Sequence, residues 1–228
     1  MMAMNRDNSE KTVIFGDVHG DADRLEKALE FYLKEPPSRI IFTGDYINRG
    51  KQSRRVLDLL ISSIFEHPSN IVLLRGNHEE SLLKFLDGGK LADFAAHGGL
   101  ATIKSYLGTV HSGAPEGFKE EFPKEHRELI EGTLSFYEDQ SILVSHAGFD
   151  PQDPQSRNPV ALYLKGHHGL FCHPGPWPRP LTVCGHYVQN SRKPYDTENL
   201  VCLDTGCGTL PNGPLTSLIL PERTYVQF

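Results

Sequence analysis

The chain has 228 residues and a formal net charge of −6, and 38% of its residues are hydrophobic. At this length such a composition supports a substantial core within one domain. The acidic balance argues against proteins that coat nucleic acid or lie on a membrane surface, because both usually need a basic face. We therefore expect neither nucleic acid nor a membrane as a partner.

Short, continuously apolar runs recur along the chain and are typical of strands buried on both faces of a sheet. In chain order they are Thr12–Phe15, Arg39–Thr43, Asn70–Leu74, Ser141–Ser145, Leu181–Cys184 and Leu200–Leu203. Apolar spacing predicts amphipathic helices over Asp21–Leu33 and Ser53–Phe65, between the early strands. Thr216–Leu220 and Thr224–Phe228 are predicted to close the fold as a hairpin. Strand–helix–strand alternation indicates an α/β layered domain.

A long helical stretch separates the third and fourth predicted strands. From about Glu79 to Tyr137 the pattern is mostly amphipathic, with glycine breaks. We interpret residues 79–137 as a helical cap inserted into a single domain that spans residues 1–228. Further along, Gly166–Pro180 is rich in Gly, Pro and His and is expected to form a surface loop near the functional site.

The cysteines and the N-terminus indicate the compartment. Four cysteines are present, none in a CxxC pair, so free thiols in a reducing environment are the simpler interpretation. The polar segment Met1–Lys11 lacks the apolar stretch of a secretory signal. No run approaches the roughly 18 apolar residues of a membrane helix. These features predict a cytoplasmic protein.

Polar residues follow the predicted strands at their carboxyl ends, where α/β sheets bind ligands. They are Asp17, His19, Asp45, Asn77, His78, His146 and His186. Carboxylates, an amide and imidazoles together suit divalent ions such as Mn²⁺, Fe²⁺ or Zn²⁺, and are too rich in histidine for Mg²⁺ or Ca²⁺ alone. Gly16, Gly44 and Gly76 precede members of this set and would let each strand turn sharply into the crevice.

Three ordered motifs resemble the signatures of the phosphoprotein phosphatase family, which belongs to the calcineurin-like metallophosphoesterases. They are Gly16–Gly20 (GDVHG), Gly44–Gly50 (GDYINRG) and Arg75–Glu79 (RGNHE). Ser145–Gly148 (SHAG) and Gly185-His186 resemble the family's two later histidine motifs, and DTGCG at 204–208 resembles the closing segment of its bacterial branch. One such motif would be a weak signal, whereas the ordered set is specific.

The resemblance implies a fold, two cofactors and a role for each matching residue. The implied fold is a four-layer α/β/β/α sandwich of two mixed sheets. Two divalent ions are implied, Mn²⁺ first, with Fe²⁺ or Zn²⁺ also compatible. By the family pattern, Asp17 and His19 bind the first ion, Asp45 bridges both, and Asn77, His146 and His186 bind the second. His78 matches the general acid, and Arg49 matches the arginine that, with Asn77, contacts the phosphate.

Two positions depart from the family pattern. Asn48 stands where protein phosphatases of the family usually carry an aspartate beside the acid histidine, and a neutral amide stabilises imidazolium less. Tyr163-Leu164-Lys165 stands where a Trp-x-Arg segment supplies a second arginine, and Lys165 offers a point charge rather than a planar fork. Arg157 is a candidate replacement for that arginine.

These residues predict a dinuclear-metal enzyme that hydrolyses phosphate monoesters, either a serine/threonine-type phosphoprotein phosphatase or an enzyme for a small phosphoester. A hydrolase of dinucleoside polyphosphates such as diadenosine tetraphosphate is the alternative, because an anhydride needs less acid catalysis and tolerates Asn48. A catalytically degenerate module that binds metal and phosphorylated ligands is a third interpretation. The acidic balance disfavours a nucleic-acid phosphodiesterase. The sequence leaves the substrate and the oligomeric state open.

Overall fold

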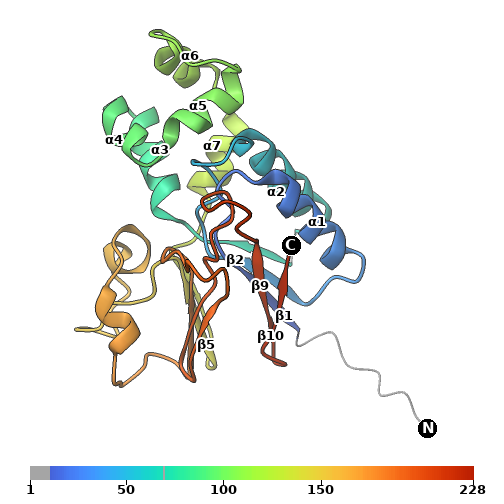
Figure 1. Ribbon diagram of the computed structural model, residues 1–228, viewed down its shortest axis with the longest axis vertical. Coiled ribbons are helices and arrows are strands. Elements are labelled where there is room, and N and C mark those ends of the chain that lie inside the picture. Colours follow the sequence, from blue (N-terminus) through green and yellow to red (C-terminus); the bar gives the residue numbers. More distant parts are fainter. Residues whose placement is uncertain (1–10, 69) are drawn as a thin grey trace.

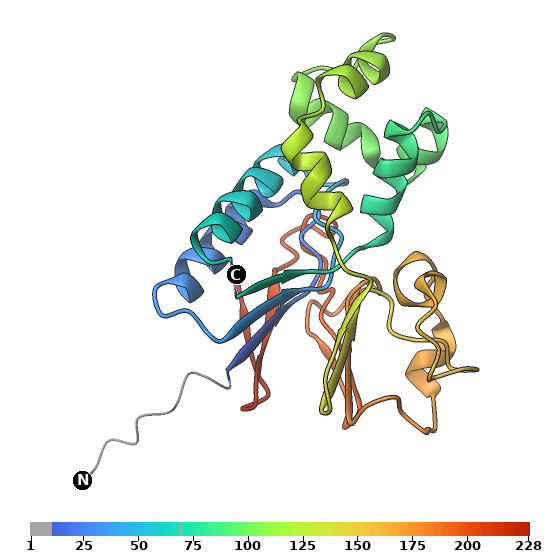
Figure 2. The ribbon, with the colours of Figure 1, turned by 180° about the vertical axis from the view of Figure 1, so that it is seen from behind.

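The computed structural model describes residues 11–68 and 70–228 and contains two mixed β-sheets that face each other (Figures 1 and 2). The polar segment of residues 1–10 lies outside the described residues. The first sheet has the strand order β10-β9-β1-β2-β3. Its parallel strands are β1 (Thr12–Phe15), β2 (Arg39–Phe42) and β3 (Ile71–Leu73), and its antiparallel strands are β9 (Thr216–Leu220) and β10 (Thr224–Gln227).

The second sheet repeats this arrangement with the order β4-β5-β6-β8-β7. Parallel strands β5 (Ile142–Ser145), β6 (Leu181–Cys184) and β8 (Leu200–Cys202) form its centre, and antiparallel β4 (Phe136–Glu138) and β7 (Tyr195–Asp196) form its edges. The two edge strands were not predicted. Both are short and no more than half-buried, so they lack the continuous apolar run that marks the central strands.

Successive residues of a strand point to opposite faces, so each central strand contributes to two cores. In β1, Phe15 packs outward with Phe42 in a stacked pair at 4.7 Å between centroids, against Tyr32 of the first helix. Ile14 points the other way, into the apolar layer between the sheets, together with Val144 of the second sheet. This double burial explains why the strands read as unbroken apolar runs.

Helices cover the outer face of the first sheet. They are α1 (Ala22–Leu33), whose first turn is capped by Asp21 through a bond from the Arg24 backbone N–H, and α2 (Ser53–Glu66). The outer face of the second sheet is covered by the segment drawn in orange in Figure 1, which contains the π-helix η2 (Val160–Leu164) and the 3₁₀-helix η3 (His168–Cys172). The predicted α/β fold with two mixed sheets is confirmed, with a fourth layer made of short helical turns.

Five helices lie between β3 and β4 in the chain and stand beyond the ends of both sheets in Figures 1 and 2. They are α3 (Asn77–Leu86), α4 (Leu91–Ala96), α5 (Gly99–Leu107), α6 (Ala114–Glu121) and α7 (Lys124–Glu131). The helical stretch thus ends before Tyr137, because Phe136 and Tyr137 pair with β5. The cap as a unit, and the single domain that carries it, stay predictions. Among the described residues, no helix has both the length and the apolar character needed to cross a bilayer.

Candidate active site

The polar residues predicted at the strand ends come together where the parallel strands of both sheets finish. Asp17 and His19 follow β1, and Asp45 follows β2. Asn77 and His78 form the first turn of α3, directly after β3. His146 and His186 follow β5 and β6 of the other sheet. The site therefore lies between the two sheets, below the helices of residues 77–131.

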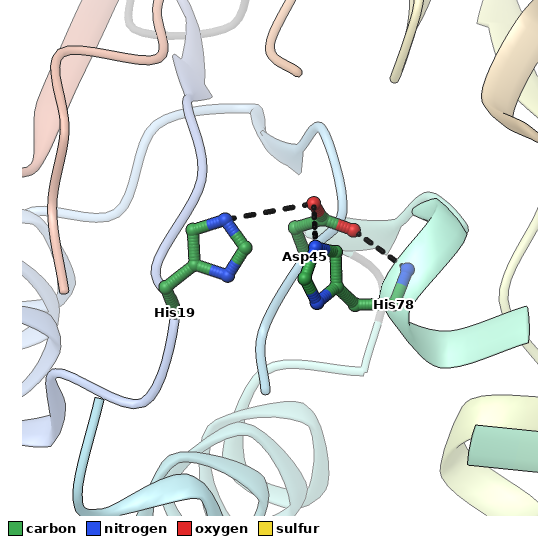
Figure 3. A group of neighbouring side chains, drawn as sticks. All are labelled: His19, Asp45 and His78. Atoms are coloured by element: carbon green, nitrogen blue, oxygen red, sulfur yellow. Dashed lines mark hydrogen bonds and ion pairs between the residues drawn. The ribbon is translucent and has the colours of Figure 1, made fainter. Parts of the chain in front are cut away.

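Asp45 lies at the centre of this group. Its Oδ2 atom is 3.4 Å from Nε2 of His146 and 3.6 Å from Nε2 of both His19 and His78. Figure 3 shows the carboxylate of Asp45 between the rings of His19 and His78. Its other oxygen accepts a bond of 3.1 Å from the backbone N–H of His78. One carboxylate thus faces three imidazoles from separate elements.

A second convergence surrounds the side-chain oxygen of Asn77. This Oδ1 atom is 3.0 Å from Nε2 of His146 and 3.0 Å from Nδ1 of His186, and these two ring nitrogens are 3.1 Å apart. Three potential ligand atoms, one each from Asn77, His146 and His186, therefore face one another.

The residues fit metal ions. Atoms bonded to one ion at about 2.1 Å lie roughly 3.0–3.5 Å apart, close to the separations around Asp45 and Asn77. His19 Nε2 is buried and has no hydrogen-bond partner among the described residues. It lies 3.7 Å from Asp17 and 3.6 Å from Asp45, too far for a hydrogen bond but suitable for a shared ion. His19–Asp45–His78 and Asp17–Asp45–His146 each form a candidate ligand group that includes Asp45.

The electrostatics of the site also favour bound cations. Burial lowers the pKa of His19 to about 3 and that of His78 and His186 to about 4, so these imidazoles are neutral at pH 7. Burial, with repulsion from Asp204 and Asp45, raises the pKa of Asp17 well above its usual value. Neutral imidazoles beside a carboxyl group that resists ionisation are the environment that a bound cation would stabilise.

Two glycines let the backbone approach the carboxylates. A Cβ atom at Gly76 would lie 2.0 Å from Oδ1 of Asp45, and one at Gly185 would lie 2.0 Å from Oδ1 of Asp17. The predicted reason for Gly76, a sharp turn, is wrong, because its φ of −99° is open to any residue. Only glycine fits there because the carboxylate takes the space of a side chain.

Several site residues have left-handed backbone conformations. The φ angles are 43° for His19, 55° for Asp45, 69° for Asn48, 62° for Arg49 and 65° for His186. Each such residue costs on the order of 1–3 kcal/mol, and strain of this kind concentrates at functional sites. The fold therefore orients these side chains at a cost in stability.

His78 has a close polar neighbour at each ring nitrogen. Nδ2 of Asn48 lies 2.9 Å from His78 Nδ1, and Nη2 of Arg49 lies 3.2 Å from His78 Nε2. The hydroxyl of Thr102 donates to Oδ1 of Asn48 at 2.7 Å and accepts from the Asn48 backbone N–H at 3.0 Å. Arg49 also donates to the hydroxyl of Thr209 at 3.1 Å. The predicted trio of His78, Arg49 and Asn48 is thus one connected network.

Three supporting residues were missed or undervalued by sequence reasoning. Glu79 entered the sequence analysis only as the last residue of the RGNHE motif, but its buried carboxylate accepts bonds from the backbone N–H groups of Asp45 and Tyr46 at 2.8 Å and of Gly76 at 3.0 Å. Asp204 is buried, and its Oδ2 has no partner among the described residues. Thr102 lies within the predicted helical stretch of residues 79–137, where no site role was assigned to it. Their signal was burial, which single-sequence patterns do not reveal.

Arg157 and Lys165, the two side chains considered in place of the family's second arginine, differ in their surroundings. Arg157 donates to both carboxylate oxygens of Glu138, at 2.9 and 2.6 Å, and to the carbonyls of Pro154 and Ser156. This engagement counts against its predicted role in phosphate binding. Lys165 has an exposed side chain directly after η2. Its role stays a prediction.

Comparison with known proteins agrees with this geometry. The calcineurin-like phosphoesterase family matches residues 10–200. A candidate diadenosine tetraphosphatase is similar in structure, with a TM-score of 0.65 and 19% identity over 96% of this chain and 92% of that one. A cold-active protein-tyrosine phosphatase from a psychrophilic Shewanella has a TM-score of 0.60 and 16% identity, over 95% of this chain and 80% of that one. A serine/threonine phosphatase from Saccharomyces cerevisiae has a TM-score of 0.56 and 16% identity, over 98% of this chain and 81% of that one. At these identities the likenesses show the fold alone.

Proposed function

Because this chain belongs to the calcineurin-like phosphoesterase family, we propose that it is a phosphomonoesterase that works with two divalent ions. Asp17 and His19 would hold one ion, Asn77, His146 and His186 the other, and Asp45 both, with Mn²⁺ as the first candidate. The observation that carries the proposal is Asp45, one carboxylate oxygen of which faces the imidazoles of His19 after β1, His78 in α3 and His146 after β5 at 3.4–3.6 Å. When bound, the two ions supply a nucleophile by lowering the pKa of water, and they neutralise charge on the phosphoryl group.

The residues around His78 support a role in binding the phosphoryl group and protonating the leaving oxygen. The Thr102 hydroxyl lies 2.7 Å from Asn48 Oδ1 and 3.0 Å from Ser53 Oγ; when it donates to Asn48 Oδ1, Asn48 Nδ2 is the donor to His78 Nδ1. The proton of the neutral ring then lies on Nε2. Two donors, His78 Nε2 and Arg49 Nη2, stand 3.2 Å apart. A phosphoryl oxyanion beside them would satisfy both.

The leaving group decides how well this arrangement works. A neutral imidazole donor is a weaker acid than the imidazolium ion that an aspartate at position 48 would favour. Phosphoserine and phosphothreonine release a poor alkoxide leaving group, so Asn48 counts against the serine/threonine specificity that the sequence predicts. A phosphoanhydride such as diadenosine tetraphosphate leaves readily without strong acid, so Asn48 favours this second candidate. Both candidates share the same two-metal chemistry.

The test is the hydrolysis of p-nitrophenyl phosphate by metal-stripped protein before and after Mn²⁺ is added. This ester has a good leaving group, so a weak acid at His78 should not conceal activity. We expect activity only with metal, and its loss in Asp45→Asn. Folded protein that stays inactive with Mn²⁺, Fe²⁺ and Zn²⁺ would instead support the degenerate binding module. Comparing a phosphoserine peptide with diadenosine tetraphosphate then separates the two substrate classes.

A further inference from the structure

A hollow of about 440 Å³ adjoins the candidate metal site on the side of the second sheet. Its lining includes Gly166, His168 and Phe171 from the η2–η3 segment, and His186 and Tyr187 from the end of β6. His186 therefore belongs both to this hollow and to the proposed ligand set. A group that occupies the hollow would lie beside a proposed metal ligand.

Aromatic rings form much of the wall of the hollow, beside Val188 and Gln189. Phe171 and Tyr187 meet edge to face, with centroids 4.9 Å apart and an interplanar angle of 90°. Phe171 also meets Tyr195 at 5.0 Å, and His186 meets Tyr187 at 5.0 Å. The rings of His168 and Tyr187 are 6.2 Å apart. Phe171 and Tyr187 are only half-buried, so part of each ring faces the hollow.

Hydrogen bonds and close packing fix the position of these rings. The Tyr187 hydroxyl donates to the carbonyl of Ala147 at 3.0 Å and accepts from the backbone N–H of His167 at 2.7 Å. The hydroxyl is thus occupied, and the ring is what remains for a ligand. A Cβ atom at Gly166 would lie 2.8 Å from the rings of both His186 and Tyr187, so the η2–η3 segment lies directly against them.

Such a wall suits a flat aromatic ring. Rings gain from edge-to-face or offset contacts beyond the area they bury, and a pre-positioned wall adds little ordering cost on binding. An alkyl group gains only the apolar area. Gln189, a polar residue of the lining, already donates from Nε2 to the carbonyl of Tyr187 at 2.6 Å, so the exposed ring faces favour a π-system.

We propose that this hollow is a substrate subsite for an aromatic ring carried by the phosphoryl compound, as in an aryl phosphate ester. The inference rests on the proposed function, because it places the ring beside the phosphoryl group at the metal site. A nucleobase offers the same flat π-face. The experiment below therefore distinguishes an aryl ester from a nucleotide.

Binding is measured first, since it needs no turnover. Phenylphosphonate and methylphosphonate carry the same non-hydrolysable phosphonate and differ in the ring. Calorimetry on the Mn²⁺-loaded protein should show that phenylphosphonate binds about tenfold more tightly than methylphosphonate. Phe171→Ala should remove most of that difference. Phe65→Ala is the matched control, because Phe65 is 86% exposed on α2, away from the hollow, and this variant should retain the tenfold ratio.

Turnover then identifies the source of the ring. Phenyl phosphate, diadenosine tetraphosphate and acetyl phosphate, a reactive phosphate without a ring, are compared in the wild type and in Phe171→Ala. A fall of about tenfold in kcat/KM for phenyl phosphate relative to acetyl phosphate supports the aryl ester, and a fall confined to diadenosine tetraphosphate assigns the hollow to a nucleobase. Equal affinities for the two phosphonates would overturn the subsite even if acetyl phosphate is hydrolysed. Tight phenylphosphonate binding without hydrolysis of any substrate would preserve the subsite and contradict the phosphomonoesterase.

Discussion

Nδ2 of Asn48 lies 2.9 Å from Nδ1 of His78, so a neutral amide supports the candidate general acid. Changing Asn48 to Asp puts a carboxylate there, which stabilises imidazolium and makes His78 a stronger proton donor near neutral pH. We expect Asn48→Asp to raise kcat for a phosphoserine peptide by about tenfold and to change p-nitrophenyl phosphate hydrolysis little, because general acids contribute about 10²–10⁴-fold mainly with poor leaving groups. Steady-state kinetics on the two substrates measure this. Equal changes for both substrates would contradict an acid role for His78.

Metal binding should raise the thermal stability of the protein. An ion at 100 times its dissociation constant stabilises the folded state by about 2.7 kcal/mol, which for 150–250 residues is a rise in Tm of roughly 5–10 °C. We therefore expect metal-stripped protein to gain several degrees when Mn²⁺ is added, as measured by scanning fluorimetry. Asp45→Asn should lose most of that gain because Asp45 contributes to both candidate ligand groups. Asp153→Asn, which alters an exposed carboxylate, should keep it. An undiminished gain in Asp45→Asn would place the metal elsewhere.

Glu79 should contribute more to the stability of the fold than its neighbour Glu80 does. Its carboxylate accepts backbone N–H bonds from Asp45, Tyr46 and Gly76, and an amide would turn a donor toward one of them. Leaving a buried donor unsatisfied costs about 1–3 kcal/mol, so we expect Glu79→Gln to lower the free energy of unfolding by about 2 kcal/mol. Urea denaturation of the metal-free protein measures this. Glu80→Gln, in a 3.4 Å ion pair with Arg75, should stay within about 0.5 kcal/mol of the wild type. Similar losses in both variants would refute the specific role.

Sequence reasoning recovered the central strands and the site because both depend on local patterns. Runs such as Thr12–Phe15 are buried at every position, and polar residues that follow these runs within a few positions mark the sheet edge. The short edge strand Tyr195–Asp196 carries no such pattern and exists through its pairing with Cys202 and Val201. Edge strands of this kind depend on tertiary contacts that a single sequence does not encode locally.

The same distinction separates the site residues. His19 and His146 were found because each follows a strand within a motif. The contact of Thr102 with Asn48 joins residues 54 positions apart, and the pairing of Arg157 with Glu138 depends on an edge strand that was not predicted. Long-range side-chain partners follow from packing, so their roles required the structure.

A hydrogen-bond relay through the buried His126 gives the last prediction. The hydroxyl of Tyr106 lies 2.6 Å from Nδ1 of His126, and His126 Nε2 lies 2.9 Å from Oδ1 of Asp58, so the relay links α5, α7 and α2. Burial lowers the pKa of His126 even though Asp58 opposes this shift. The unfolded chain, with a histidine pKa of about 6.5, therefore takes up a proton before the native state does.

The sign of this linkage fixes the expected pH dependence. As pH falls below about 6.5, proton uptake by the unfolded chain lowers the stability that His126 contributes, whereas above that pH the contribution is complete. We expect His126→Gln to be about 1–2 kcal/mol less stable than the wild type at pH 7.5, from the loss of two partly buried hydrogen bonds. That difference should shrink between pH 6.5 and pH 5. Urea titrations at each pH measure it, with Tyr106→Phe as the control, because that variant removes one hydrogen bond and keeps the imidazole. A difference that stays constant or grows toward pH 5 would show that His126 is charged in the folded protein.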